Sequence, residues 1–487
     1  MILSHNRFHA YLPLALSIAF IVIIHGAYAQ PSPLYRYEKL LTDIESLDWS
    51  EDRCIEINHE LTSEVQKLGK PSRADAVDVQ KRGRDILERS FLSRVYIRKQ
   101  LERMHERGTL TEPCAVSFKV LFRHLRGAED YISRLSILSR NEVSIGPKYN
   151  GFLPLDTNMA RGKPEEFEVR SGDIMISRGN APTSAAISRL GDIDAQFSHL
   201  GLIYIDEKTK KAYTIEAHIE IGVVVAPLSD WFKDGKSRTA LYRYKGSAKV
   251  AHEAAKKMYL RTLSATNTGE NIHYDFAMDM NDHKDLFCSE VAKAGFEGAD
   301  RNLVFPIYPS IVKPKNRYFL ELLGIKATRA FLPADMEIEP QFEFLAEWRA
   351  PTRIHKVWKK DAVLTKMFEW MESKSYRFDF NAFHALKMIT ARSLRRLGFL
   401  KKDFQLYIPK STMQTIFVLD PTVEELENYL DKKENENLKN MGLPYTYFEM
   451  LGLLENLRIE KETNHKPLTR YFKHKSLILE SPSVRPF

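Results

Sequence analysis

The first part of the chain has the apolar pattern of packed helices. Between about residues 32 and 137, apolar side chains recur every three or four positions and helix breakers are few. Pro71 and Pro113 interrupt this pattern and are expected at turns between helices. We therefore predict a helical N-terminal region at 30–145 that contains three or four helices.

The last part of the chain is again mostly helical in pattern. Helical periodicity covers 358–372 and 381–397, whereas 422–441 is highly charged and is expected to be solvated. These stretches predict a helical C-terminal region at 331–487. The chain contains no internal repeat and no low-complexity tract.

The middle of the chain changes to short apolar runs with the length of β-strands. A polar turn at 206–211 separates two of these runs, 200–205 and 212–217, and this arrangement predicts a β-hairpin. An amphipathic stretch at 249–263 predicts a helix. The pattern as a whole indicates an α+β protein with helical regions on both sides of a β-containing domain. Further strands are predicted at 174–176, 221–225 and 239–244.

The N-terminus has the pattern of a secretory signal peptide. A basic start precedes an apolar stretch at 12–24, and the small residues Ala27 and Ala29 precede Gln30. The apolar stretch is shorter than the ~20 residues that cross a membrane. We predict a cleaved signal peptide at 1–29 and a secreted or periplasmic protein, with an uncleaved anchor as the alternative.

The chain contains only three cysteines, Cys54, Cys114 and Cys288. In an oxidising compartment Cys54 and Cys114 could pair within the N-terminal helical region. Such pairing would leave Cys288 free. An unpaired cysteine in an exported protein suggests a reactive thiol.

Composition and charge indicate the class of protein and the kinds of partner that suit it. Hydrophobic residues make up 44% of the chain and charged residues 28%, which excludes a disordered chain or a polytopic membrane protein. The net charge of +8 is modest for 487 residues and suits an anionic envelope surface or cell-wall polymer. No basic run with interleaved aromatic residues occurs, so we expect no nucleic-acid partner.

Cys288 stands where a buried helix is predicted to begin. Val291, Ala292 and Phe296 give the following segment one apolar face, and Gly295 is expected to end the helix. The partial positive charge at a helix N-terminus favours a thiolate. Unpaired N–H groups of the first turn can also stabilise an oxyanion. The alternative is that Cys288 is a small buried hydrophobic residue.

His199 opens the first strand of the predicted hairpin, and Glu216 lies on the second. With the turn centred near Glu207 and Lys208, residues whose numbers sum to about 415 face each other, which pairs His199 with Glu216. A carboxylate there can accept the ring N–H and fix the tautomer of the imidazole. His218 lies on the same face of the strand and is a competing candidate for this role.

Five short motifs occur in a fixed order along the chain: Ser171-Gly172-Asp173-Ile174, Ser198-His199-Leu200-Gly201, Ile215-Glu216-Ala217, Tyr274-Asp275-Phe276 and Phe287-Cys288-Ser289-Glu290. Together they resemble the permuted papain-like amidase family of YaeF/YiiX type, within the NlpC superfamily. In that family the histidine precedes the cysteine, which reverses the usual papain order. The resemblance covers about a third of the chain and implies a circularly permuted papain-like (NlpC-type) domain with an antiparallel sheet at 165–325.

The resemblance implies a role for each matched residue. Cys288 matches the nucleophile, His199 the base and Glu216 the third polar residue. Asp173 and Tyr274 match positions near the cleft and are candidates for substrate binding. The alternatives are a structural turn cap for Asp173 and core packing for Tyr274. The resemblance requires no metal and no other cofactor.

Two features lie outside the minimal family domain. The insertion between the first strand and His199 contains Arg178, Asn180, Thr183 and Arg189, and is polar enough to line or cover the cleft. The two helical regions have no assigned function and are expected to limit access to the site or to bind a partner.

Three functions follow from these residues. The first is hydrolysis of an amide through an acyl-enzyme on Cys288, with a cell-wall peptide as a substrate that fits export. The second uses the same thiol on a lipid ester, as a hydrolase or acyltransferase. The third is a binding protein in which the papain-like domain is degenerate.

Overall fold

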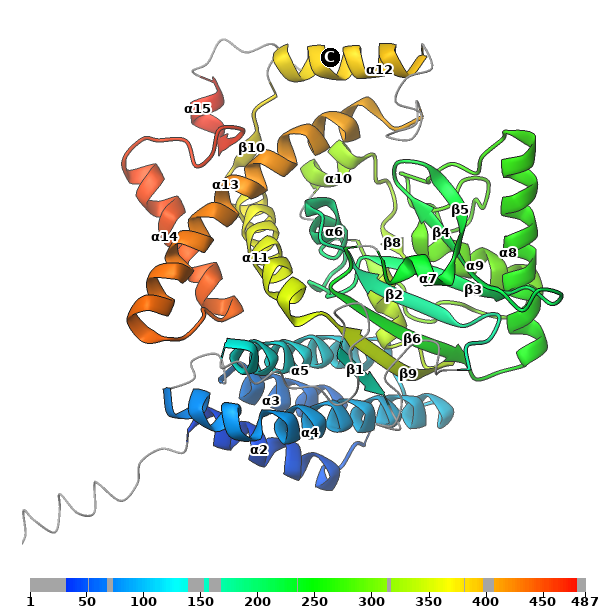
Figure 1. Ribbon diagram of the computed structural model, residues 1–487, viewed down its shortest axis with the longest axis horizontal. Coiled ribbons are helices and arrows are strands. Elements are labelled where there is room, and N and C mark those ends of the chain that lie inside the picture. The colour runs from blue at the N-terminus through cyan, green and yellow to red at the C-terminus, as the bar shows by residue number, and fades with distance from the viewer. Residues whose placement is uncertain are drawn as a thin grey trace, which may run out of the picture.

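The computed structural model describes residues 32–50, 52–67, 73–138, 153–156, 168–233, 235–312, 317–380, 382–396 and 407–479. The predicted signal peptide at 1–29 lies outside these residues. No helix within the described ranges is long and apolar enough to cross a membrane. Helices from both ends of the chain pack around a central sheet (Figure 1).

The sheet has seven strands in the order β1-β9-β6-β2-β3-β4-β5, and every neighbouring pair is antiparallel. The five strands predicted from the sequence are confirmed, and so is the α+β class. Two further strands, β1 and β9, were not predicted. The bounds are β1 Leu153–Asp156, β2 Ile174–Arg178, β3 His199–Ile205, β4 Ala212–His218, β5 Gly222–Pro227, β6 Arg238–Tyr244 and β9 Phe342–Arg349.

Two helices, α8 (Ala248–Thr268) and α9 (Cys288–Ala299), cover one face of the sheet. Leu200 and Leu202 alternate along β3 and point into the core that these helices share with the sheet. The prediction that Gly295 ends α9 is wrong, because the helix continues through it. A Cβ atom on Gly295 would lie 2.9 Å from the carbonyl oxygen of Ala254, so the glycine allows α8 and α9 to pack closely.

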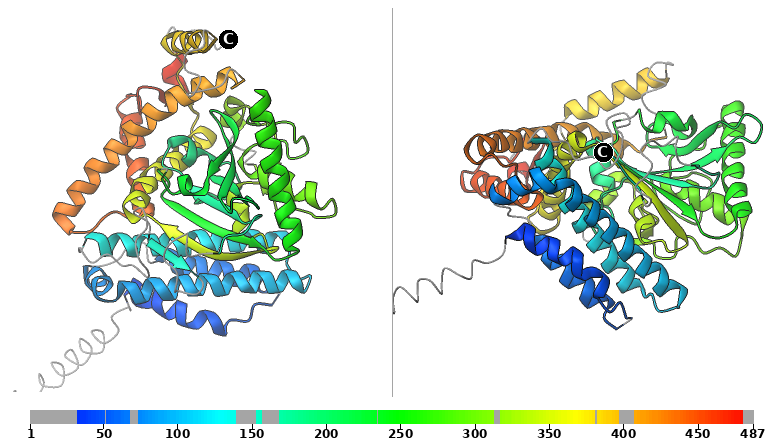
Figure 2. Two further views of the ribbon diagram at one scale, coloured as in Figure 1. Left: turned by 45° about the vertical axis from the view of Figure 1, so that its right-hand side comes forward. Right: turned by 60° about the horizontal axis from the view of Figure 1, so that its bottom comes forward.

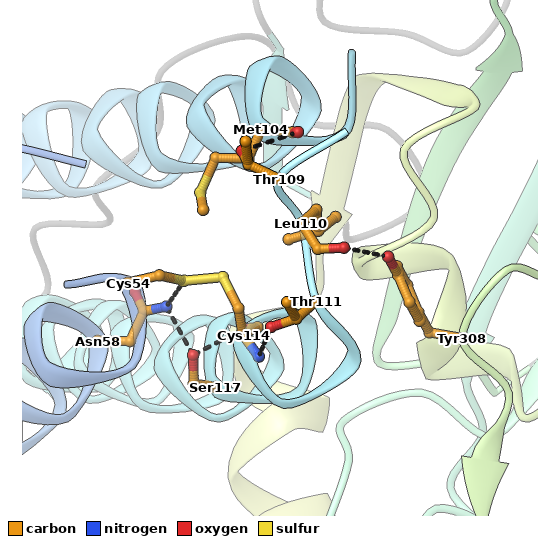
Figure 3. The surroundings of a disulfide bond; sticks show 9 residues. All are labelled: Cys54, Asn58, Met104, Thr109, Leu110, Thr111, Cys114, Ser117 and Tyr308. Carbon is orange, nitrogen blue, oxygen red and sulfur yellow. Dashed lines mark hydrogen bonds between the residues drawn. A yellow bond between two sulfur atoms is a disulfide. The ribbon is translucent and has the colours of Figure 1, made fainter. Parts of the chain in front are cut away.

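The N-terminal region consists of four α-helices within the described residues, as predicted: α2 (Pro33–Asp43), α3 (Cys54–Lys67), α4 (Arg73–Glu106) and α5 (Glu112–Leu138). The sequence leaves open whether Cys54 and Cys114 pair, and in the structure they form a disulfide. This disulfide joins α3 to the start of α5 with a Cα–Cα distance of 5.8 Å (Figure 3). Beside it, the Asn58 side-chain amide donates to Ser117 Oγ at 2.8 Å.

A buried cluster of arginines and carboxylates attaches these helices to the sheet. We call it the Arg–carboxylate cluster; its formal charges of +4 and −4 cancel, and all of its side chains are buried. Its centre is Glu347 on β9, which pairs with Arg94 of α4 at 3.0 Å and Arg126 of α5 at 3.2 Å. The members are Arg94, Arg126, Arg238, Arg349, Glu129, Asp130, Glu337 and Glu347.

The C-terminal region packs against the N-terminal helices through α11 (Pro351–Ser373) and α5, and against the sheet domain through α11 and α6 (Pro182–Ile187) (Figure 2). Asp361 on α11 lies in this contact and accepts hydrogen bonds from Arg178 and Arg189, the latter at 2.9 Å. The described helices of this region are α11 Pro351–Ser373, α12 Ala382–Arg396, α13 Lys410–Met441, α14 Tyr447–Thr463 and α15 Lys475–Leu479. Helix α10 (Arg317–Leu323) precedes this region and belongs to the sheet domain. Short two-stranded sheets pair β7 Ser310–Ile311 with β8 Arg329–Ala330, and β10 Tyr376–Phe378 with β11 Phe472–His474.

The substitution Glu347→Gln is expected to lower the free energy of unfolding by about 3–5 kcal/mol, because it leaves buried arginines without their shared carboxylate. Urea unfolding measures this change. Glu436→Gln is the control, since Glu436 pairs with Lys433 on the surface at 3.3 Å and should contribute at most about 1 kcal/mol. Equal effects of the two substitutions would contradict a structural role for the cluster.

Removing the disulfide by the double substitution Cys54→Ser/Cys114→Ser is expected to lower the free energy of unfolding by about 2–4 kcal/mol. The cause is the freedom regained in the unfolded chain, since the bonded residues are 60 positions apart. Thermal melting with and without dithiothreitol measures it. The reductant should lower the melting temperature of the wild type and leave that of the double variant unchanged.

Candidate active site

An open cleft of about 950 Å³ lies where the sheet meets the N-terminal end of α9. Cys288, His199 and Tyr274 line it together, although they lie far apart in sequence. Glu216 is buried behind His199. The structure therefore brings four of the five predicted site residues to one place.

Cys288 is the first residue of α9 and the free cysteine of the described residues. The preceding Phe287 is extended, and its N–H is accepted by Glu290 Oε2 at 3.4 Å, which fixes where the helix begins. Cys288 is buried, with its sulfur 3.8 Å from Ser289 Oγ. The thiol therefore lies at the positive end of a helix, as predicted.

His199 and Glu216 are in direct contact, with His199 Nε2 2.7 Å from Glu216 Oε2. The predicted register is nevertheless wrong by two residues, because Gly201 faces Glu216. A two-residue shift keeps every side chain on its own face of the sheet, so Glu216 still reaches His199 diagonally. Thr214 Oγ1 donates to the other carboxylate oxygen, Oε1, at 2.6 Å and fixes the carboxylate.

Gly201 makes room for this diagonal contact. A Cβ atom at that position would lie 2.6 Å from the Trp231 ring and 3.2 Å from Glu216 Cγ. Trp231 in turn stacks on the His199 imidazole, with 5.7 Å between ring centroids. A side chain at position 201 would displace both partners of His199.

The charges of the site shift the pKa values of both partners. Burial acts to lower the pKa of His199, but hydrogen bonds to Cys288 and Glu216 outweigh it and raise the pKa to about 9. Burial acts to raise the pKa of Glu216, but the His199 hydrogen bond and charge, together with Lys236 and His218, lower it to about 2. Because Nε2 of His199 faces Glu216, Nδ1 is the nitrogen left for the thiol. The arrangement favours an imidazolium between two acceptors at neutral pH.

His218 contacts Glu216 but is farther from it than His199 is. Its Nε2 lies 3.6 Å from Glu216 Oε2, and its ring centroid is 5.1 Å from that of His199. Between the two predicted candidates for the third residue, the geometry favours Glu216, since its oxygen meets the ring nitrogen of His199.

The two predicted substrate-binding residues lie in different places. Tyr274 lines the cleft, and burial and the nearby Cys288 raise the pKa of its phenol well above the ordinary value. Asp173 lies at the opposite end of β2 from the strand pair Ser177 and His199, and it pairs with Arg243 at 2.8 Å. Asp173 does not line the cleft, so its predicted contact with substrate is not retained; it also accepts the Arg170 backbone N–H at 2.8 Å, as a turn cap does.

Some side chains of the polar insertion line the cleft, and others are buried away from it. Asn180 and Thr183 line the cleft, whereas Arg178 and Arg189 turn away to Asp361 of α11. Ser177 also lines the cleft, and it was not predicted. Ser177 Oγ and Asn180 Oδ1 are buried and have no hydrogen-bond partner among the described residues, so both can serve a ligand.

Lys236 and Trp231 are further site residues that the sequence analysis missed. Lys236 Nζ lies 4.5 Å from the centre of the Trp231 ring, and its charge helps to lower the pKa of Glu216. Neither residue belongs to a short motif. Helix α7 (Leu228–Trp231) brings Trp231 to the hairpin only in the folded chain, and Lys236 follows that helix. No local signal in the sequence marks them.

His199, Glu216 and His218 could also bind a divalent cation. One donor atom from each residue lies within 4.8 Å of the others. Imidazole and carboxylate donors suit zinc and related metals. The expectation of a metal-free site therefore stays a prediction.

Comparison with known proteins identifies the class of the domain. Residues 168–345 match the model of the family described as permuted papain-like amidase enzyme, YaeF/YiiX, C92 family, which confirms the resemblance. A domain of this family thus occupies the part of the chain that carries the cleft.

Among solved structures, the chain is similar to the metalloprotein yiiX from Escherichia coli O157:H7. The match covers 37% of this chain and 97% of that chain, with 20% sequence identity and a TM-score of 0.28. No curated protein matches the chain.

Glu216→Gln is expected to lower the pKa of His199 from about 9 towards its ordinary value near ~6.5, because it removes the carboxylate that stabilises the imidazolium. In the wild type, the stability that this charge contributes is fully present below about pH 6.5 and is lost as pH rises through about 9. An NMR titration of the histidine rings measures the midpoint for His199.

His218→Gln is the matched control for this titration, since His218 contacts the same carboxylate at a longer distance. The control should retain most of the raised pKa of His199. A smaller shift for Glu216→Gln than for His218→Gln would assign the third role to His218 instead.

Proposed function

We propose that this protein is an exported thiol hydrolase that cleaves amide bonds through an acyl-enzyme on Cys288. The observation that carries the proposal is the thiol at the first position of α9, within hydrogen-bonding reach of a His199 ring that Glu216 holds. This is the nucleophile, base and orienting group of covalent acyl transfer. The family of the domain, named for permuted papain-like amidases, supports the same chemistry.

In the acylation step, the Cys288 thiolate attacks the carbonyl carbon of the amide and a C–S bond forms. The oxyanion that develops lies near the backbone N–H groups of Cys288 and Ser289, which begin α9, and near the Tyr274 phenol. The His199 imidazolium gives its proton to the amide nitrogen, the C–N bond breaks, and the amine leaves.

In the deacylation step, water attacks the thioester carbon while His199, now neutral, accepts a proton from it. The C–S bond breaks, the carboxylic acid leaves, and the thiolate is restored beside an imidazolium. Glu216 stabilises the charged ring at both ends of the cycle, and its low pKa keeps it ionised. No atom or electron is required beyond the substrate and one water.

Two features support the proposed export. The first 29 residues have the pattern of a cleaved signal peptide. The disulfide between Cys54 and Cys114 belongs in an oxidising compartment. In the periplasm or outside the cell, the net charge of +8 would favour contact with an anionic envelope surface or cell wall.

The alternatives differ in substrate or in activity. A cell-wall stem peptide supplies amides in the proposed compartment, whereas a lipid ester would use the same thiol. A non-catalytic binding protein would need neither the His199 imidazolium nor the Glu216 carboxylate beside the thiol. The completeness of this site favours an enzyme over a binding protein.

Cys288→Ala is expected to reduce turnover of amides by at least ~10³-fold, because no acyl-enzyme can form. Hydrolysis of a panel of stem-peptide amides and fatty-acyl amides measures it. Ser289→Ala is the matched control: it removes a hydroxyl 3.8 Å from the sulfur and should leave the rate within about threefold. Addition of a chelator should leave wild-type turnover unchanged.

Iodoacetamide gives an independent readout of the same thiol. Since Cys54 and Cys114 are bonded, one label per chain is expected, on Cys288, identified by peptide mass spectrometry. Full amide turnover by Cys288→Ala, or loss of turnover on chelation, would overturn the proposed mechanism.

A further inference from the structure

A separate cavity, which we call the interface cavity, lies where the N-terminal helices, the sheet domain and the C-terminal region meet. It encloses about 640 Å³, within the ~300–1,000 Å³ of small-molecule sites. Helix α5 forms one side, and α11 and the start of α14 form another, since α11 contacts both helices (Figure 1). None of the described residues that line the interface cavity also lines the thiol cleft.

Arg123 of α5 brings an unpaired positive charge to this cavity. Its Cζ lies 5.0 Å from the centre of the Tyr447 ring, and its guanidinium pairs with no carboxylate among the described residues. Its Nε is buried without a hydrogen-bond partner, which costs free energy unless a ligand supplies an acceptor. The other charged residues of the lining, Arg189 and Asp361, bind each other at 2.9 Å. The lining therefore carries one excess positive charge.

Two buried side chains add further hydrogen-bond donors. Tyr131 and Trp358 line the cavity and are only 5% and 6% exposed. Within the described part of the chain, neither the Tyr131 hydroxyl nor the Trp358 indole N–H has a hydrogen-bond partner. Burial, with smaller effects of Glu449 and Asp75 outside the lining, raises the pKa of the Tyr131 phenol, so it stays protonated and can donate. Together with Arg123, these donors match an anion.

The cavity also has flat apolar walls. The rings of His124 and Phe448 are stacked, with 6.1 Å between their centroids. His124 Nδ1 donates to the carbonyl oxygen of Val120 at 2.8 Å, and burial lowers the pKa of the ring to about 4, so it is uncharged at neutral pH. Phe448 is exposed, so the cavity is reached from the surface at this end. Such walls suit a flat apolar body.

Gly127 leaves space in the middle of α5. It lines the cavity, and a Cβ atom added to it would meet nothing within 4 Å. Its backbone is that of an ordinary α-helix, so neither a left-handed conformation nor close packing requires glycine here. Glycine inside a helix lowers helix stability relative to other residues. The position therefore offers room for a ligand, and a larger side chain would fill that room.

We propose that the interface cavity binds a small organic anion with a flat apolar body, such as an aryl carboxylate. The carboxylate pairs with Arg123 and accepts hydrogen bonds from Tyr131 and Trp358, and the ring lies against the aromatic walls. Because all three regions of the chain line the cavity, the bound anion stabilises their arrangement. This site is independent of the proposed hydrolase, since Cys288 takes no part in it.

Isothermal titration calorimetry of the full chain with benzoate, 2-naphthoate and indole-3-acetate tests the proposal. At least one of these acids should bind saturably at one site per chain, with a Kd of about 1 mM or below. The neutral amide of the same acid should bind at least ~tenfold more weakly, because it lacks the charge that pairs with Arg123. Failure of all three acids to bind, or equal binding of acid and amide, would overturn the proposal.

Two substitutions locate the bound acid. Gly127→Leu fills the cavity and should weaken binding at least ~tenfold, without lowering the melting temperature of the free protein. Gly452→Leu is the matched control: Gly452 is an exposed position inside α14 where a Cβ atom also meets nothing within 4 Å, and binding should stay within about twofold. Arg123→Met keeps a long side chain without its charge and should bring the Kd of the acid to that of its amide.

The thiol cleft serves as the remaining comparison. Cys288→Ala should bind the acid within about twofold of the wild type, because the cleft and the interface cavity share no lining residue. Binding that either Gly127→Leu or Arg123→Met leaves unchanged would place the acid elsewhere and overturn the proposal. Loss of binding in Cys288→Ala would move the acid to the cleft and overturn it as well.

Discussion

The buried pairing of Glu347 with its arginines is the constraint on which the architecture depends. Isolated charges cannot leave water without a large cost, so the four arginines and four carboxylates of the Arg–carboxylate cluster must be buried together. Burial acts to raise the pKa of Glu347, yet Arg126, Arg94 and Arg238 lower it to about 2. Because these arginines come from α4, α5 and β6, the N-terminal helices and the sheet are held in one arrangement. The N-terminal region is thus part of the folded unit and not an appendage.

Strand pairing in the sheet connects the Arg–carboxylate cluster to the candidate active site. β9 holds β6, β6 pairs with β2, and β2 pairs with β3, which begins at His199. Close packing at Gly295 fixes α9 against α8 and β3, and so places Cys288. The thiol and the imidazole therefore reach the cleft on separate elements, each fixed by packing away from the cleft. Gly201 supplies the remaining requirement, which is space for Glu216 to cross diagonally to the ring.

The sequence was sufficient for the hairpin, the helix of Cys288 and the four residues that meet at the cleft, because alternation and local motifs mark them. It was not sufficient for the register. The oxygen of Asp206 accepts the N–H groups of Lys208 and Thr209, and Lys210 has φ of 58°, so the turn is centred one position later than expected. Asp173 was expected to contact substrate, but it binds Arg243, which lies 70 positions away in the sequence. No local sequence pattern predicts this pairing. The sequence analysis did not predict β9 because its residues lie within a long stretch that is mostly helical in pattern.

The contacts of α6 distinguish the roles of the N-terminal and the C-terminal helical regions. α6 faces the thiol cleft with Thr183 and Ser184. Ala186 lines an adjacent apolar cavity, and α13 of the C-terminal region lines the same cavity. Arg178 and Arg189, on either side of α6, both bind Asp361 of α11, so the short helix is held by the C-terminal region at both ends. The N-terminal helices, in contrast, contact the sheet through the Arg–carboxylate cluster, and none of their described residues lines the cleft. One helical region therefore stabilises the sheet, and the other shapes the space beside the nucleophile.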